Sequence, residues 1–106
     1  MPRTPRHLHY PPDRLGQVRV WMDAHGVDVL IIGQGNGAIV ISAAHATECE
    51  DHVMMLAVIR LRWRQGRSMA IYSLPPDLSA QIEDEALQVG VATRHLTEDP
   101  EGRFRL

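Results

Sequence analysis

Residues 58–74 carry the pattern that most constrains the fold of this chain. In the first half of this segment apolar residues alternate with arginines, and a break containing Gly66 then precedes a second β-rich run, 69–74. A period of two places the apolar residues on one face of a strand and the arginines on the other. The glycine break is typical of a hairpin turn. The pattern therefore predicts a β-hairpin with an apolar face of Ile59, Leu61 and Trp63 and an arginine face of Arg60, Arg62 and Arg64.

A long helix is the alternative interpretation of this segment, because residues 54–59 are continuously apolar. A helix running to Gln65 would place Arg60, Arg62 and Arg64 on more than one of its sides. A strand gathers the same three arginines on one face. The strand is therefore favoured and the helix is rejected.

The remaining signals predict an α/β or α+β fold in one small domain. Two Pro-Pro-Asp sequences open helices, and Gly26 and Gly90 close them. The Ala-rich, acidic segment 42–52 is typical of a short helix. Further β-rich runs predict strands at 27–32, 38–41 and 91–96. The predicted architecture is a mixed β-sheet with a central hairpin, two main helices and one short helix.

The length of 106 residues fits a single domain. We expect residues 1–11, which contain three prolines, to form a flexible arm. Residues 12–97 are predicted to form the α/β domain, and residues 98–106 a polar tail.

The composition is that of an ordinary soluble globular domain, with 44% hydrophobic and 23% charged residues. A single cysteine excludes an internal disulfide, and the chain shows neither a signal peptide nor an apolar run long enough to span a bilayer. We therefore expect a cytoplasmic location and no membrane partner. The net charge of -2 does not by itself predict a nucleic-acid-binding protein.

Another pattern joins the first predicted helix to the strand that follows it. Its residues are Arg14, Leu15, Val18, Arg19, Met22, Gly26 and the run VDVLI at 27–31. They resemble the opening of the amino-terminal domain of the creatinase and Xaa-Pro aminopeptidase family, where a helix of the form RLxxLRxxMxxxG precedes a strand of the form VDALLV. Segment 33–52 departs from that family pattern, and the family's metal-binding catalytic domain has no counterpart here. The resemblance implies a non-catalytic module that helps to shape assembly and the substrate mouth.

Four side chains that could bind a metal fall in or beside the short helix predicted over 42–52. They are His45, Glu48, Cys49 and His52. Helical spacing would place them on one face, and imidazole, thiolate and carboxylate are zinc ligands. A polar helix surface with a small buried cysteine is the favoured interpretation, so no metal or cofactor is predicted. An active zinc deaminase is not predicted, because the acid of its H-x-E motif is missing after His45 and no cysteine lies near Pro76 for its P-C-x-x-C motif.

The candidate binding residues are the four arginines of the predicted hairpin, Arg60, Arg62, Arg64 and Arg67. The chain has no lysine, and guanidinium groups suit bidentate contacts with carboxylates or phosphates. A solvated strand face is the ordinary alternative. No catalytic triad spacing is visible, so no catalytic residue is predicted.

The predicted function is therefore a non-enzymatic protein-interaction module. Its expected partner is a protein with an acidic surface or a second copy of the chain. Small accessory or inhibitory proteins of phages and other mobile elements have this profile. Two alternatives stay open: nucleic-acid binding through the arginine face, and metal binding at His45, Glu48, Cys49 and His52.

Overall fold

A hairpin of two strands, β1 (Val29–Gln34) and β2 (Gly37–Ser42), forms the centre of the fold. The computed structural model describes residues 12–64 and 67–106. Gly35 makes the tight turn between the strands with a φ of 57°, which favours glycine. All six residues of β2 and the first four of β1 are buried, because layers of other elements cover both faces of the sheet.

The sheet has five strands in the order β3-β2-β1-β4-β5. The edge strand β3 (Ala46–Cys49) runs antiparallel to β2. On the other side, β4 (Ser68–Tyr72) runs parallel to β1, and β5 (Ala92–His95) runs parallel to β4. Parallel neighbours need crossover connections, which α2 (His52–Arg62) and α3 (Pro76–Gln88) supply. This arrangement confirms the predicted mixed sheet with helices packed on it.

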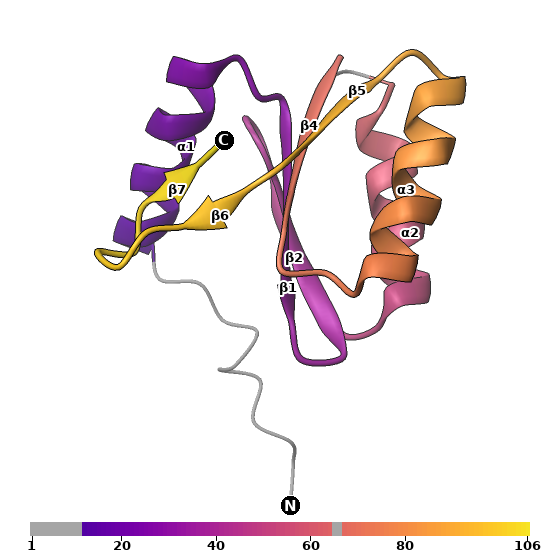
Figure 1. The fold of residues 1–106 in the computed structure, drawn as a ribbon, viewed down its shortest axis with the longest axis horizontal. Helices are drawn as coiled ribbons and strands as arrows, with labels where there is room; N and C mark the ends of the chain where they lie inside the picture. Colours follow the sequence, from indigo (N-terminus) through magenta and orange to yellow (C-terminus); the bar gives the residue numbers. More distant parts are fainter. Residues whose placement is uncertain (1–11, 65–66) are drawn as a thin grey trace, which may run out of the picture.

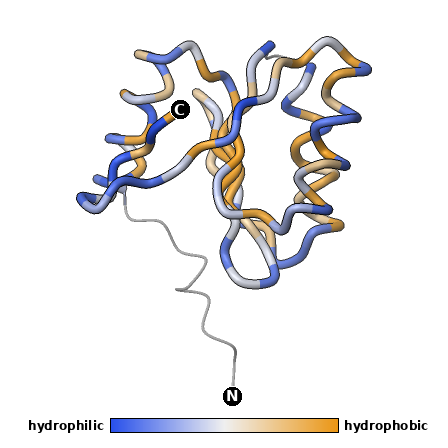
Figure 2. Tube along the Cα trace, in the orientation of Figure 1, coloured by the Kyte–Doolittle hydropathy of each residue, from blue (hydrophilic) through white to orange (hydrophobic). Residues whose placement is uncertain are grey.

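Helices cover both faces of the sheet (Figure 1). One face carries α1 (Pro12–His25) and a two-stranded ribbon of β6 (Thr97–Glu98) and β7 (Phe104–Arg105). The opposite face carries α2 and α3. Figure 2 shows that hydrophobic residues concentrate along the strands between these two layers. None of the helices in the described ranges is long and apolar enough to cross a membrane.

Alternating residues of the strands divide the core into two parts. Leu30 and Ile32 belong to the part under α1, whereas Val29 and Ile31 belong to the part under α2 and α3. In α2 it is mainly Met55 and Ile59, one turn apart and fully buried, that attach the helix to the sheet. Burial of each such side chain contributes about 1.5–3 kcal/mol.

The prediction of a strand over residues 59–64 is wrong, because most of this segment lies in α2. Ile59 and Trp63 are one helical turn apart and both face the core, whereas Leu61 lies on the opposite, exposed side of the helix. The apolar residue Leu61, between Ile59 and Trp63 in the sequence, therefore produced the period-two pattern of a strand although it does not face the core. A helix, the alternative rejected in the sequence analysis, is what this segment forms, but it ends at Arg62. Gln65, where the rejected helix was to end, and the predicted turn at Gly66 lie outside the described residues. The second half of the predicted hairpin does form a strand, β4.

The start of α2 lies where the side chain of Asp51 caps the helix. Its Oδ1 atom accepts a hydrogen bond of 2.8 Å from the backbone N–H of Met54. An aspartate that precedes an apolar run is a helix-start signal. The start of α2 was therefore signalled in the sequence by Asp51. The strand was nevertheless favoured, because of the alternation of arginines with apolar residues.

Two other segments differ from their predictions. The short helix predicted over 42–52 is wrong, because residues 46–49 form the edge strand β3. The predicted polar tail folds into the β6–β7 ribbon, in which Phe104 is only 8% exposed and packs edge-on against the rings of Trp21 and Tyr72. Arg14 holds this ribbon by donating a 2.9 Å hydrogen bond to the carbonyl of Gly102. The arm predicted over residues 1–11 lies outside the described residues.

Candidate functional site

The outer side of α2 is an exposed apolar surface. Val53 is 79% exposed, Leu61 is 51% exposed and Met54 is 42% exposed, and the exposed Ala57 lies between them. Spacings of three and four residues place these four side chains in one stripe along the helix, which we call the α2 stripe. A surface helix normally presents polar residues on this side. Exposed apolar patches rimmed by charges mark interaction sites more often than they serve the fold.

Side-chain hydrogen bonds to neighbouring elements hold the helix that carries the α2 stripe in place. The Trp63 indole at its C-terminal end donates a hydrogen bond of 3.3 Å to the Met69 sulfur. The Arg60 guanidinium binds both carboxylate oxygens of Glu85 on α3, at 2.9 and 3.0 Å. The hydrogen bond from Arg60 lowers the pKa of Glu85, because it favours the ionised carboxylate. The geometry of the exposed face is therefore set by the scaffold.

Charges of opposite sign lie at the two ends of α2. Glu50 and Asp51 precede the helix, and its C-terminal end carries the arginines Arg60, Arg62 and Arg64. Both sets suit the helix dipole, which favours anions at the N-terminus and cations at the C-terminus. The apolar stripe is consequently bounded by an acidic end and a basic end.

The structure does not place the four predicted binding arginines on one strand face. Arg60 is held by Glu85, and Arg62 is half-buried and turns toward a cavity. Arg64 is exposed just beyond α2, and Arg67 is exposed before β4. What these arginines share is their position at one end of the molecule, where α2 leads into β4.

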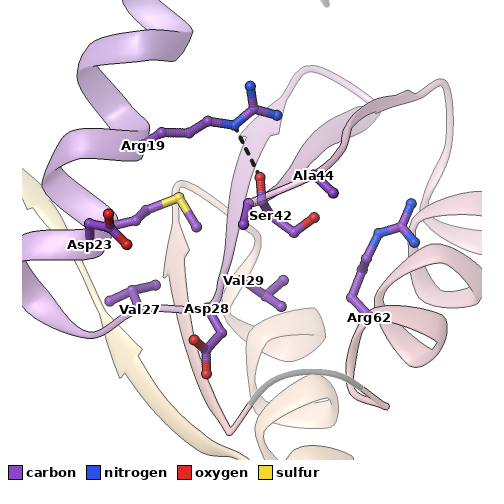
Figure 3. Close-up of a pocket in the computed structure, with 10 residues that line it drawn as sticks. Arg19, Asp23, Val27, Asp28, Val29, Ser42, Ala44 and Arg62 are labelled. Carbon is purple, nitrogen blue, oxygen red and sulfur yellow. Dashed lines mark hydrogen bonds between the residues drawn. The ribbon is translucent and has the colours of Figure 1, made fainter.

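A cavity of about 390 Å³ opens at this end of the molecule, between α1, the hairpin and α2 (Figure 3). Arg19 lines it from α1 and donates a 3.1 Å hydrogen bond to the backbone carbonyl of Ser42. Arg62 lines it from α2, and its Nε atom is buried without a hydrogen-bond partner in the described parts of the chain. Asp23 and Asp28 bring two carboxylates to the same lining. The cavity lining therefore holds two arginines and two aspartates, so its charges are balanced.

The hydrogen bonds around the cavity are mainly structural. Asp28 Oδ2 accepts from the backbone N–H groups of Arg67 and Ser68, at 2.8 and 3.2 Å, and so fixes the entry to β4. The Ser42 hydroxyl exchanges hydrogen bonds with the backbone of His45, within its own turn. Sequence reasoning did not identify Arg19 as a neighbour of Arg62, because only the tertiary fold brings α1 and α2 to the same end of the sheet.

The predicted metal ligands do not form one helical face. Glu48 and Cys49 are adjacent on β3, so their side chains point to opposite sides of the strand. Cys49 is fully buried, and burial, with a further contribution from the Asp51 carboxylate, raises the pKa of its thiol. His45 lies before β3 and His52 in the first turn of α2. Across residues 12–64 and 67–106, no three metal-binding side chains come together.

Comparisons with known proteins do not assign the chain to a family. No protein-family model matches it, and no curated protein or solved structure matches it either. The resemblance to the creatinase and Xaa-Pro aminopeptidase amino-terminal domain therefore stays a prediction. Function has to be inferred from the surfaces of the domain.

Proposed function

We propose that this chain is a non-enzymatic protein-interaction module that binds its partner through the α2 stripe. The observation that supports the proposal is an apolar surface, Val53, Met54, Ala57 and Leu61, on a helix whose inner face is already fully used by the core. Leaving these side chains in water gains nothing for the fold, whereas burying them against a partner contributes about 25 cal/mol per Å² of apolar area. A protein surface is the partner that uses such a patch.

The charges around the α2 stripe support a protein partner with an acidic region. Arg64 and Arg67 are exposed beside the C-terminal end of α2. Carboxylates on the partner would complement this end, guide association and fix orientation. The nucleic-acid alternative relied on a row of arginines along one strand, and α2 replaces that strand. The metal alternative relied on a helix that is replaced by β3.

Two further observations agree with this proposal. The resemblance noted in the sequence implies a non-catalytic module, as proposed here. The one cysteine, Cys49, is a buried free thiol, which suits the reducing cytoplasm in which we place the protein. An accessory or inhibitory role on a phage or other mobile element would use such a binding surface.

Matched variants of the full chain test this proposal. Leu61→Glu places a charge in the α2 stripe. Leu87→Glu places one at a leucine of α3 that is also exposed, 74% against 51% for Leu61, and that lies beside Val91 and Thr93 on the side toward β5. Tagged wild-type and variant chains are used to capture partners from the source cell, and each partner is then purified and titrated against all three chains. We expect Leu61→Glu to weaken binding at least about tenfold, as at an interface hot spot, and Leu87→Glu to have little effect. A partner that binds all three chains equally well would contradict the proposal.

A further inference from the structure

Apart from Met54, whose matching position is Arg60, the α2 stripe and its charged ends are symmetric about Ala57. Val53 and Leu61 lie equally far from Ala57 along the chain, one helical turn on either side. Glu50 and Arg64 also lie equally far from Ala57, each two residues beyond an end of α2, and they carry opposite charges. A surface with this pattern is complementary to itself after a half-turn.

We propose that the partner seated on the α2 stripe is a second copy of this chain, packed with the two α2 helices antiparallel. In a twofold pair the same patch serves both subunits. With the axis at Ala57, Val53 of each chain meets Leu61 of the other. Glu50 of each chain likewise lies near Arg64 of the other. This inference rests on the proposed function, since it names the occupant of the same surface.

The residue at the axis suits a close helix crossing. Ala57 carries only a methyl group, so the helices can approach to about 8 Å, the short end of the usual range. The larger side chains of Val53 and Leu61 then fill the space on either side of the contact. A large or charged residue at position 57 would hold the two helices apart.

Charge selects the antiparallel orientation. In a parallel pair the acidic residues Glu50 and Asp51 of one copy would face the same residues of the other, and the two arginine ends would also meet. Such like-charge contacts oppose association. The antiparallel pair instead brings each acidic end to a basic end and opposes the two helix dipoles favourably.

The size of the α2 stripe implies a weak dimer. α2 has 11 residues and is therefore about 16 Å long. One contact of this length falls at the low end of specific interfaces, below about 1,200 Å² in total. We therefore expect monomers at low concentration and dimers at high concentration, with a Kd of roughly 10 μM to 1 mM.

Analytical ultracentrifugation of the full chain between about 1 μM and 1 mM tests the dimer, a range that spans the expected Kd. We expect reversible dimerisation that is lost in Leu61→Glu and kept in Leu87→Glu. Both substitutions lie at exposed positions, so circular dichroism should show that each variant is folded. A wild-type chain that stays monomeric over this range, or a dimer that Leu61→Glu leaves unchanged, would overturn the inference.

Charge reversal tests the orientation independently. Glu50→Arg alone and Arg64→Glu alone should each dimerise less than the wild type, because each creates like-charge contacts at both ends of the interface. A mixture of the two variants should form heterodimers, since both end contacts then pair opposite charges. Single variants that dimerise as well as their mixture would overturn the antiparallel arrangement.

Cysteine cross-linking tests the position of the axis. Ala57→Cys should form a disulfide between two chains, because the two Cβ atoms at the axis can reach the roughly 3.8 Å that a disulfide requires. Leu61→Cys alone should not, whereas a mixture of Val53→Cys and Leu61→Cys should. The wild-type chain, whose one cysteine is the buried Cys49, serves as the control for background cross-linking. Efficient cross-linking of Leu61→Cys to itself would place the axis elsewhere and reject the pairing.

The outcomes separate this inference from the proposed function. If the chain is monomeric but a different protein binds through Leu61, the α2 stripe is an interaction surface and the second-copy inference fails. If Leu61→Glu affects neither dimerisation nor the binding of another protein, both the second-copy inference and the proposed function fail.

Discussion

The helices α2 and α3 cover the same face of the sheet but present different surfaces to solvent. Each attaches to the core through side chains one turn apart, Met55 and Ile59 in α2 and Ile82 and Ala86 in α3. The exposed residues of α3 are mostly polar or acidic, including Gln81, Glu83, Asp84 and Gln88. Those of α2 are mostly apolar. Because the packing requirement is the same, the fold alone does not account for the α2 stripe.

The two helices also begin differently. The Asp51 side chain caps α2, whereas α3 follows Pro75 and has no side-chain hydrogen bond at its cap. α3 relies on a proline in its first turn and on Asp77 near its N-terminus. The first turn of α2, where Val53 and Met54 lie, is therefore fixed by a specific hydrogen bond.

The largest expected effect separates the two sides of α2. Ile59→Asp should lower the free energy of unfolding by about 3 kcal/mol or more, because it buries a charge in the core. Leu61→Asp should lower it by less than about 1 kcal/mol, because Leu61 is exposed. Urea unfolding followed by circular dichroism measures both changes. Equal losses would mean that both residues face the core, as they would in a strand, and would contradict the helix.

The cap of α2 gives a smaller effect. Asp51→Ala should cost about 1 kcal/mol of stability, the usual value for losing an N-cap hydrogen bond. The matched change in α3, Asp77→Ala, should cost less, because only the interaction with the helix dipole is weakened. Thermal unfolding of the two variants makes this comparison. A greater loss of stability for Asp77→Ala than for Asp51→Ala would contradict the claim that only α2 has a side-chain cap.

The smallest effect concerns the pair that joins α2 to α3. Arg60 lowers the pKa of Glu85, so this pair stabilises the fold above the ordinary pKa of a glutamate. The contribution should be lost as the pH falls through the lowered pKa of the folded state. Arg60→Gln should therefore reduce stability slightly at pH 7 and have no effect at pH 2. Equal changes in melting temperature at both pH values would show that the loss comes from packing.

Much of the fold could be predicted from local signals. Two helices, α1 and α3, begin at the Pro-Pro-Asp sequences and end near the predicted closing glycines. The four predicted β-rich runs correspond to four strands of the sheet. In α3 the buried residues Ser79, Ile82 and Ala86 recur at the spacing of one helix face. The mixed sheet followed from the order of these helices and strands, and the structure confirms it.

The region from β3 through α2 could not be predicted in the same way. A helix with apolar residues on both its inner and outer sides lacks the one-sided pattern that identifies a surface helix. Leu61 then combined with Ile59 and Trp63 to imitate a strand. The same apolar outer side that misled the prediction is what makes the α2 stripe a candidate interaction surface.

The candidate site was only partly visible in the sequence. The arginines near the end of α2 were identified, but Glu85, the partner of Arg60, was not, because it is distant along the chain. Arg19, which lines the same cavity as Arg62, is distant along the chain as well. The zinc-type spacing at His45, Glu48, Cys49 and His52 depended on a helix that does not form. Long-range neighbours of this kind require the tertiary structure.

The most direct test of the account compares amide NMR spectra of the full chain at increasing protein concentration. The expected result is a set of concentration-dependent shifts centred on residues 50–64, around Val53, Ala57 and Leu61, with α3 and its exposed Leu87 unaffected. Leu61→Glu should abolish these shifts. Shifts centred on α3 or β5, or spectra that do not change with concentration, would contradict the claim that α2 presents a surface for a second copy of the chain.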